Sequence, residues 1–134
     1  MQSKRLAATL VMGSALSVSL IGLAAPANAA LSQCGKGLGC MWTEPTYGSD
    51  FSGFGSNLNL NESRNRISSV ANMGYAGAYD VARFYDGLNY EGPNIAMYEP
   101  LDGRQSRDPD LRNGIVGNGE SWDNRIESGA FRNY

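Results

Sequence analysis

The stretch Arg64-Asn65-Arg66-Ile67-Ser68-Ser69 recurs 59 residues later as Asp123-Asn124-Arg125-Ile126-Glu127-Ser128. Each copy follows a segment rich in aromatic residues and glycine, 42–53 before the first copy and 85–92 before the second. A pattern that returns in the same order, behind the same kind of segment, indicates two related structural units. The repeat therefore predicts a fold built from two similar halves.

The first 29 residues have the three parts of a secretory signal peptide. Lys4-Arg5 supplies the charged start, 6–25 is predominantly apolar, and Ala27-Asn28-Ala29 forms a small-x-small cleavage site. We expect cleavage before Ala30 and a secreted, extracellular protein that has no contact with the membrane afterwards. The alternative is an uncleaved anchor, because about 20 apolar residues can span a bilayer.

The predicted mature chain, residues 30–134, is long enough for one domain with a single core. The 11 basic residues fall to nine when Lys4-Arg5 leaves, against 13 acidic residues, so the net charge is −4. Scattered charges with an acidic balance argue against a nucleic-acid partner. We expect one monomeric domain that binds no nucleic acid.

Two cysteines, Cys34 and Cys40, lie near the start of the mature chain. In an oxidising compartment they can pair, and the glycines between them let the chain turn tightly. We predict one disulfide, which stabilises the fold by roughly 2–2.5 kcal/mol in the chain-entropy description. The spacing C-x₅-C without any histidine is not that of a zinc or redox motif.

The sequence contains no histidine. This excludes Ser-His-Asp and Cys-His nucleophile activation and metal centres that need an imidazole. Acidic residues are available, but no spacing singles out two that must converge as a general acid and base. We therefore predict that the protein is not an enzyme.

Short apolar runs separated by glycine, asparagine, aspartate and proline dominate the mature chain. Several runs alternate with a period of two, and none keeps a helical period beyond about two turns. The pattern predicts an all-β sandwich, with helix limited to a turn within 57–64. The clearest strand candidates are 40–43, 69–73, 81–85 and 95–98.

The two halves differ in length. Trp42 precedes Asn65 by 23 positions, whereas Tyr85 precedes Asn124 by 39, so the second half carries 16 additional residues. Turn-forming dipeptides and few apolar residues mark 101–120 as the place of this surplus. We expect a long loop without core contacts, either functional or mobile.

Two motifs connect the chain with a known fold. Tyr85-x₄-Tyr90-x-Gly92 resembles the aromatic signature of a βγ-crystallin Greek key, and the six-residue repeat resembles that fold's calcium signature, Asn/Asp-Asn/Asp-x-x-Ser/Thr-Ser. Three short runs, 40–42, 65–72 and 83–86, are also similar to exported actinobacterial proteins assigned to the metalloproteinase-inhibitor family of the same fold. The likeness covers nearly all of the predicted mature chain.

The resemblance implies a βγ-crystallin-like sandwich of two Greek-key motifs, at about 38–74 and 80–134, in one domain. In each motif an aromatic pair braces a folded hairpin, and a glycine adopts a backbone torsion that a side chain would obstruct. The first motif has Ser49 where glycine is expected. Phe51-Ser52-Gly53 offers a shifted alternative, in which the first hairpin carries an insertion.

The resemblance also implies calcium as a cofactor, held by a carbonyl and a hydroxyl of one motif and a side chain of the other. The first site would use the hydroxyl of Ser68, the backbone carbonyl of Arg66 and the carboxylate of Asp123. These are oxygen ligands of the kind that a hard cation prefers. We expect one working, weak site here.

The corresponding second site would consist of Asn65, Arg125 and Glu127. Glu127 stands where serine or threonine is expected, and Arg64 stands where the first motif should donate asparagine or aspartate. Arg64 would repel a cation and can pair with Glu127 instead, so we expect a disabled or altered site. The alternative for both sites is that the polar side chains only hydrogen-bond the turns they occupy.

Three functions from different classes follow. The family resemblance favours a secreted peptidase inhibitor acting on extracellular metalloproteases, with 101–120 as inhibitory loop and Asp108 or Asp110 approaching the catalytic metal. The repeat favours a calcium-binding structural or stress protein without inhibitory activity. A small secreted enzyme or toxin would need a catalytic constellation that the sequence does not contain.

Overall fold

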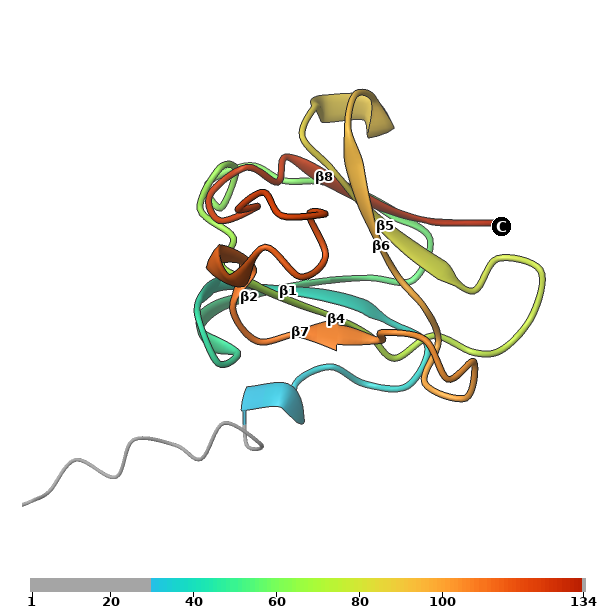
Figure 1. The fold of residues 1–134 in the computed structure, drawn as a ribbon. Coiled ribbons are helices and arrows are strands. Elements are labelled where there is room, and N and C mark those ends of the chain that lie inside the picture. The colour runs from blue at the N-terminus through green and yellow to red at the C-terminus, as the bar shows by residue number, and fades with distance from the viewer. Residues whose placement is uncertain (1–29, 134) are drawn as a thin grey trace, which may run out of the picture.

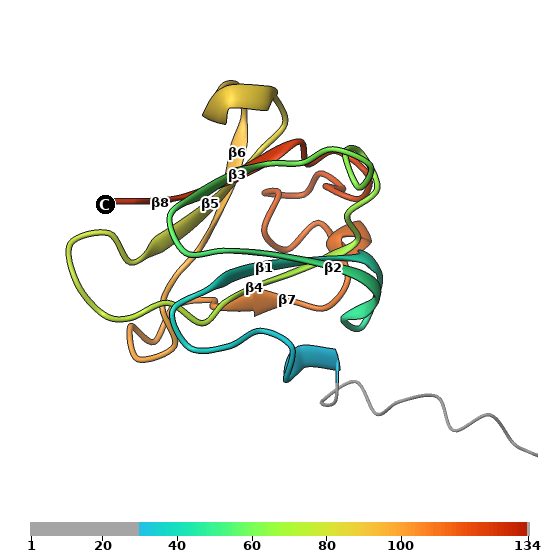
Figure 2. The ribbon, with the colours of Figure 1, turned by 180° about the vertical axis from the view of Figure 1, so that it is seen from behind.

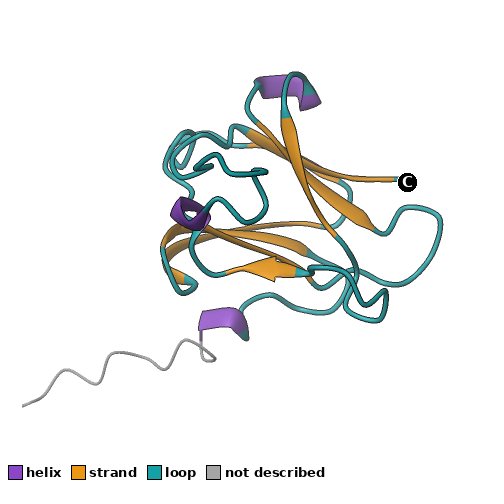
Figure 3. Ribbon diagram, viewed as in Figure 1, coloured by secondary structure: helices purple, strands orange, loops and turns teal. Residues whose placement is uncertain are grey.

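The computed structural model describes residues 30–133, which form short strands joined by turns (Figures 1 and 3). The predicted signal peptide, residues 1–29, lies outside the described residues. Within 30–133 no helix is long and apolar enough to cross a membrane. The strands are β1 (Gly39–Glu44), β2 (Gly48–Phe54), β3 (Asn57–Asn59), β4 (Ser69–Asn72), β5 (Val81–Tyr85), β6 (Asn94–Met97), β7 (Arg107–Asp108) and β8 (Ser128–Arg132), and single 3₁₀ turns form η1 (Leu88–Tyr90) and η2 (Leu111–Asn113).

The strands form two antiparallel sheets, with the orders β2-β1-β4-β7 and β3-β8-β5-β6 (Figure 2). Each sheet takes three strands from one half of the chain and one from the other, because β3 pairs with β8 and β7 pairs with β4. In each half the fourth strand returns to lie beside the first, as in a Greek key. The predicted all-β sandwich of two Greek keys is therefore confirmed.

The main core fills the space between the two sheets. Strand residues alternate between this core and the outer faces, as the period of two requires. Full burial of each large apolar side chain contributes roughly 1.5–3 kcal/mol. The fully buried members include Met41, Ile67, Val70, Phe84, Met97, Leu111 and Ile126.

A smaller core covers the outer face of the first sheet. Trp42 is fully buried there, and the N-terminal segment packs over it. Cys34 and Cys40 form the predicted disulfide, with an S–S distance of 2.07 Å and a Cα–Cα distance of 5.8 Å. The disulfide ring joins the end of β4 through the Gly37 N–H, which donates to the Met73 carbonyl (2.7 Å).

The first hairpin has the same backbone as its counterpart in the second half. Tyr47 and Tyr90 both have a positive φ, 59° and 62°. Two residues later Ser49 has a φ of 65° where Gly92 has 84°. Ser49 thus takes the glycine position itself, and the shifted alternative through Gly53 is wrong, because Ser49 has the positive φ and Gly53 does not.

The surplus segment 101–120 is not free of core contacts. It contains β7, whose Asp108 lies opposite Val70 of β4, and η2, whose Leu111 is fully buried. The expectation of a loop without core contacts was wrong, because a two-residue strand and a single apolar side chain give no periodic signal. The helix expected within 57–64 is also absent, since β3 and a hydrogen-bonded turn occupy that range.

Candidate functional site

The two repeat turns are joined to each other by backbone hydrogen bonds. Asn65 and Asn124 both adopt the left-handed conformation, with φ of 58° and 60°. The Asn65 N–H donates to the carbonyl of Ile126 (3.0 Å), and the Asn124 N–H donates to the carbonyl of Ile67 (2.9 Å). Both isoleucines are fully buried, so the paired turns are anchored in the core.

The last serine of each repeat fastens the hairpin of its own half. The Ser69 hydroxyl donates to the Glu44 carbonyl (2.8 Å) and accepts from the Tyr47 N–H (3.1 Å). The Ser128 hydroxyl donates to the Gly87 carbonyl (2.6 Å) and accepts from the Tyr90 N–H (3.2 Å). For these two serines the turn-bonding alternative describes their contacts.

Each hairpin also contains an edge-to-face aromatic pair. The ring centroids of Trp42 and Tyr47 are 5.0 Å apart, and those of Tyr85 and Tyr90 are 6.3 Å apart. Such pairs contribute about 0.5–1.5 kcal/mol beyond their buried area. The aromatic residues therefore brace the hairpins rather than line a ligand site.

The predicted first site has oxygens without partners. Ser68 is 6% exposed and uses its N–H and carbonyl to bind Trp42 and Leu111, while its hydroxyl has no hydrogen bond within residues 30–133. The carbonyl of Arg66 likewise accepts none from those residues. Asp123 Oδ1 is buried and has no hydrogen-bond partner among the described residues.

Asp123 follows the chain into the first turn, because the N–H of its neighbour Asn124 donates to the Ile67 carbonyl there. The second carboxylate oxygen of Asp123, Oδ2, accepts from the Asn124 amide (3.1 Å). A buried carboxylate oxygen without a partner costs free energy unless a donor or cation satisfies it. Oxygen donors and an unsatisfied carboxylate fit a hard cation such as calcium.

Arg112 is a neighbour of this site that the sequence did not indicate. Its guanidinium forms a two-point hydrogen bond with Asp110 (2.7 and 2.8 Å), which raises its pKa above the ordinary value. The charges of Asp123 and Glu44 raise the pKa further. The charges of Arg112 and Asp123 therefore interact, and Arg112 was missed because it lies in the surplus segment, outside both repeats.

The second turn has the same backbone contacts but different side chains. Glu127 Oε1 accepts from the Asn65 side-chain amide (2.9 Å), whereas Arg64 forms no ion pair with the described residues. The suggested pair between Arg64 and Glu127 is therefore wrong. The Arg125 side chain turns away to Asp86 (2.7 Å).

The two acidic residues predicted for an inhibitory loop have different environments. Asp108 is fully buried, and its Oδ1 accepts from the Asp110 N–H (2.9 Å) and the Asn113 amide (2.8 Å). Burial raises the pKa of the Asp108 carboxyl, although these hydrogen bonds oppose the rise. Asp110 is partly exposed, and Arg112 holds its pKa below the ordinary value. Only Asp110 is accessible to a partner.

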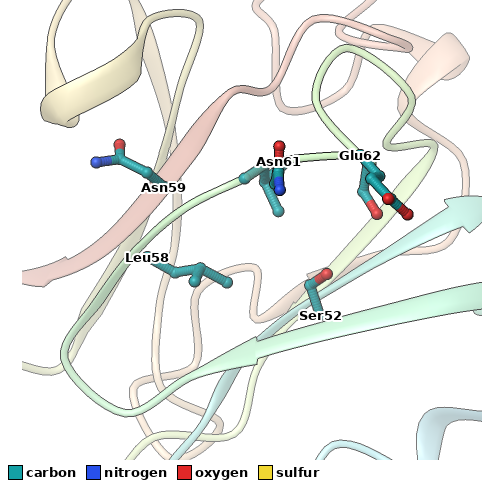
Figure 4. A pocket seen from close by; sticks show the side chains of 7 residues that line it. Ser52, Leu58, Asn59, Asn61 and Glu62 are labelled. Atoms are coloured by element: carbon teal, nitrogen blue, oxygen red, sulfur yellow. The ribbon is translucent and has the colours of Figure 1, made fainter.

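Shallow pockets flank the hairpins without including the predicted first-site ligands. One, of about 330 Å³, lies between β2 and 58–63, and Figure 4 shows Ser52 and Leu58 pointing into it. Another, of about 530 Å³, is lined by 86–89 and 91–93. Neither pocket gathers residues with an evident catalytic arrangement.

Solved βγ-crystallin structures share this fold. A βγ-crystallin from Ciona intestinalis matches with a TM-score of 0.52 at 13% identity, covering 72% of this chain and 100% of its own. A βγ-crystallin from an archaeon matches with a TM-score of 0.51 at 15% identity, covering 72% of this chain and 99% of its own. The predicted βγ-crystallin-like sandwich is thereby confirmed.

No protein-family model matches the sequence, and a search of curated proteins found no match to it. None of these comparisons connects the chain with the metalloproteinase-inhibitor family that the short runs 40–42, 65–72 and 83–86 resemble. At identities of 13% and 15%, the structural likeness extends to the fold alone. Function must therefore be argued from the residues of this chain.

Proposed function

We propose that the protein is an exported, non-enzymatic domain that binds one calcium ion at the first repeat turn and is stabilised by it. The observation that carries this proposal is the buried oxygen Asp123 Oδ1, which has no hydrogen-bond partner among residues 30–133. The free hydroxyl of Ser68 and the free carbonyl of Arg66 supply two further oxygens. Water would complete the six to eight ligands that calcium takes.

Calcium at this position would join the two halves of the chain. Asp123 belongs to the second repeat, whereas Arg66 and Ser68 belong to the first. A ligand that binds only the folded state, at 100 times its dissociation constant, stabilises that state by about 2.7 kcal/mol. A weak site with few charged ligands suits the millimolar calcium outside cells, where about 10⁻⁴–10⁻³ M dissociation constants are common.

The second turn lacks the same capacity. Asn65 already donates to Glu127, and Arg64 places a positive charge where the first site has the carboxylate of Asp123. The proposal therefore assigns calcium to the first turn alone.

Calorimetric calcium titration of wild type and Asp123→Asn tests the proposal. The substitution keeps the size of the side chain but removes its charge, so it should abolish one binding event. Glu127→Gln in the second turn is the matched control and should leave that event intact. If Asp123→Asn binds calcium with the stoichiometry and affinity of wild type, the first turn is not the site.

The exposed connection between β6 and β7 favours a second function, inhibition of an extracellular protease. Leu101 is 83% exposed at this connection. The guanidinium carbon of Arg104 lies 3.7 Å from the ring centroid of Tyr98. Arg104 also pairs with Asp102. A braced loop loses less entropy on binding than a flexible one, which is what an inhibitor requires.

Titrating a thermolysin-type metalloprotease with the protein, and a subtilisin-type enzyme in parallel, tests this second function. A stoichiometric end point with the metalloprotease that Leu101→Ser weakens would support it. Deletion of 105–116 would be uninformative, because it removes β7 and the buried Leu111. Full activity of both proteases would exclude inhibition of these enzymes.

A further inference from the structure

A second polar cluster lies at the end of the sandwich opposite the repeat turns. The repeat turns gather at one end of the molecule, and the connections 73–80 and 98–106 lie at the other (Figures 1 and 2). Asn72 ends β4, Asp80 precedes β5 and Glu99 follows β6. All three are buried, with exposed fractions of 0%, 8% and 5%.

Asn72 ties the two sheets together at this end. Its side-chain amide donates to the carbonyls of Asp80 (2.7 Å) and Met97 (2.8 Å), at the start of β5 and the end of β6. Its amide oxygen accepts from the Gly74 N–H (2.7 Å), and its own N–H donates to the Ser106 carbonyl (2.7 Å). Asn72 therefore fixes the bases of both connections.

Asp80 places a carboxylate at this end, and one of its oxygens has no partner among the described residues. Ala82 and Phe84 of β5 face the core, so the alternation places Asp80 on the core side. Its Oδ1 is buried and has no hydrogen-bond partner in residues 30–133, and its Oδ2 accepts a long hydrogen bond from the Gly77 N–H (3.4 Å). Such an oxygen is costly to bury unless something outside the described chain satisfies it.

Glu99 brings a second carboxylate from the neighbouring strand. Ala82 lies opposite Met97 in the antiparallel pair, so the register continued by two residues past each strand sets Glu99 opposite Asp80. Glu99 Oε2 accepts from the Leu101 N–H (3.0 Å). Within the described chain neither carboxylate forms an ion pair with a basic side chain.

We propose that Asp80 and Glu99 form a second calcium site at this end of the sandwich. Two buried carboxylates without a cation are compensated when a divalent ion binds between them, and both supply the oxygen ligands that calcium prefers. The ion would join the connections 73–80 and 98–106, whose bases Asn72 already fixes. The site shares no residue with the first turn and goes beyond the function proposed above.

The test uses Asp123→Asn as the background, so that the first turn no longer contributes. In calcium titrations this variant should still bind one ion, and adding Asp80→Asn or Glu99→Gln should weaken that binding at least tenfold. Adding Asp50→Asn, which removes an exposed carboxylate on β2, should change the affinity less than twofold. Terbium bound to the background variant should show tyrosine-sensitised emission that excess calcium removes, because Tyr79 and Tyr98 adjoin the two ligands.

The proposal is overturned if the background variant binds no calcium up to about 10 mM, above the range of weak extracellular sites. It is also overturned if Asp80→Asn and Glu99→Gln both leave binding unchanged. Should Asp80→Asn fail to fold, Glu99→Gln and the terbium emission still decide. The two proposals fail separately: a wild type that binds one ion, lost in Asp80→Asn and kept in Asp123→Asn, rejects the first turn and supports this site.

Discussion

The two repeat turns have the same backbone and different side-chain chemistry. Asn65 and Asn124 share one conformation, and Ser69 and Ser128 make equivalent bonds to their hairpins. The fifth position is Ser68 in the first turn and Glu127 in the second. Both turns therefore use the asparagine and the final serine in the same way. The fifth position differs: in the proposal above Ser68 supplies a ligand there, whereas Glu127 is hydrogen-bonded to Asn65.

The largest expected difference between the halves lies in their aromatic pairs. Trp42 is fully buried and contacts both Tyr47 and Phe51, whereas Tyr85 is 7% exposed and pairs with Tyr90. Trp42→Ala should lower the free energy of unfolding by about 3–5 kcal/mol. Tyr85→Ala should cost less in the same urea titration, and a larger cost there would reverse the ranking.

Replacing the final serine of the repeat by alanine should lower the free energy of unfolding by the same amount in both halves. Ser69→Ala and Ser128→Ala each remove the hydrogen bonds of one N–H and one carbonyl at buried or partly buried positions, at about 2–3 kcal/mol per substitution. Chemical denaturation of both variants measures this. A difference above about 1 kcal/mol would mean that the two hairpins do not depend equally on their serines.

Strands β3 and β7, which each join the sheet of the other half, differ at one buried position. Asp108 of β7 lies opposite Val70, where the other sheet has Leu58 of β3 opposite Gly129. Because burial raises the folded-state pKa of Asp108, its ionisation opposes folding at neutral pH. This penalty disappears as pH falls through the raised pKa toward the unfolded value.

Relative to Asp108→Asn, wild type should therefore gain stability on acidification from pH 7. Denaturation of both proteins at several pH values gives the difference directly. The raised pKa is contradicted if the difference in unfolding free energy between the two proteins does not change with pH. It is also contradicted if wild type loses stability relative to Asp108→Asn on acidification.

The smallest expected effect concerns the left-handed position that Ser49 occupies in the first hairpin and Gly92 in the second. Ser49 and Gly92 have φ of 65° and 84°, a conformation that costs a side chain about 1 kcal/mol. Ser49→Gly should stabilise the protein by about 0.5–1 kcal/mol, and Gly92→Ser should destabilise it by about 1 kcal/mol. Thermal unfolding of the pair checks the sign, and a loss in Ser49→Gly would show that its hydroxyl has another role.

Much of the architecture could be predicted from the repeat and from strand periodicity. The disulfide followed from Cys34 and Cys40, the two halves followed from the repeated motif, and the two Greek keys were implied by the resemblance of that motif to the βγ-crystallin signature. The exchange of β3 and β7 between sheets was not predictable, because pairing between distant short strands leaves no local pattern. For the same reason the sequence predicts a loop at 101–120, although Leu111 in this segment lies in the core.

The candidate site was predicted in part. The residues of the first turn were identified from the signature, but Arg112 was not, because its approach to Asp123 depends on how the surplus segment folds. Asp108 was expected at the surface, as acidic residues usually are, and it is buried. Asp80 and Glu99 belong to no motif, and only the alternation of β5 and β6 brings them to one side.

The central claim is that the first turn binds a cation and the second does not. Amide proton and nitrogen chemical shifts, followed by NMR while calcium is added to the calcium-free protein, test it most directly. At the end of the molecule where the two repeat turns lie, we expect the largest chemical-shift changes at 66–69 and at Asp123. Changes at 126–128 should be small. Equal changes around Glu127, or none in either turn, would contradict it.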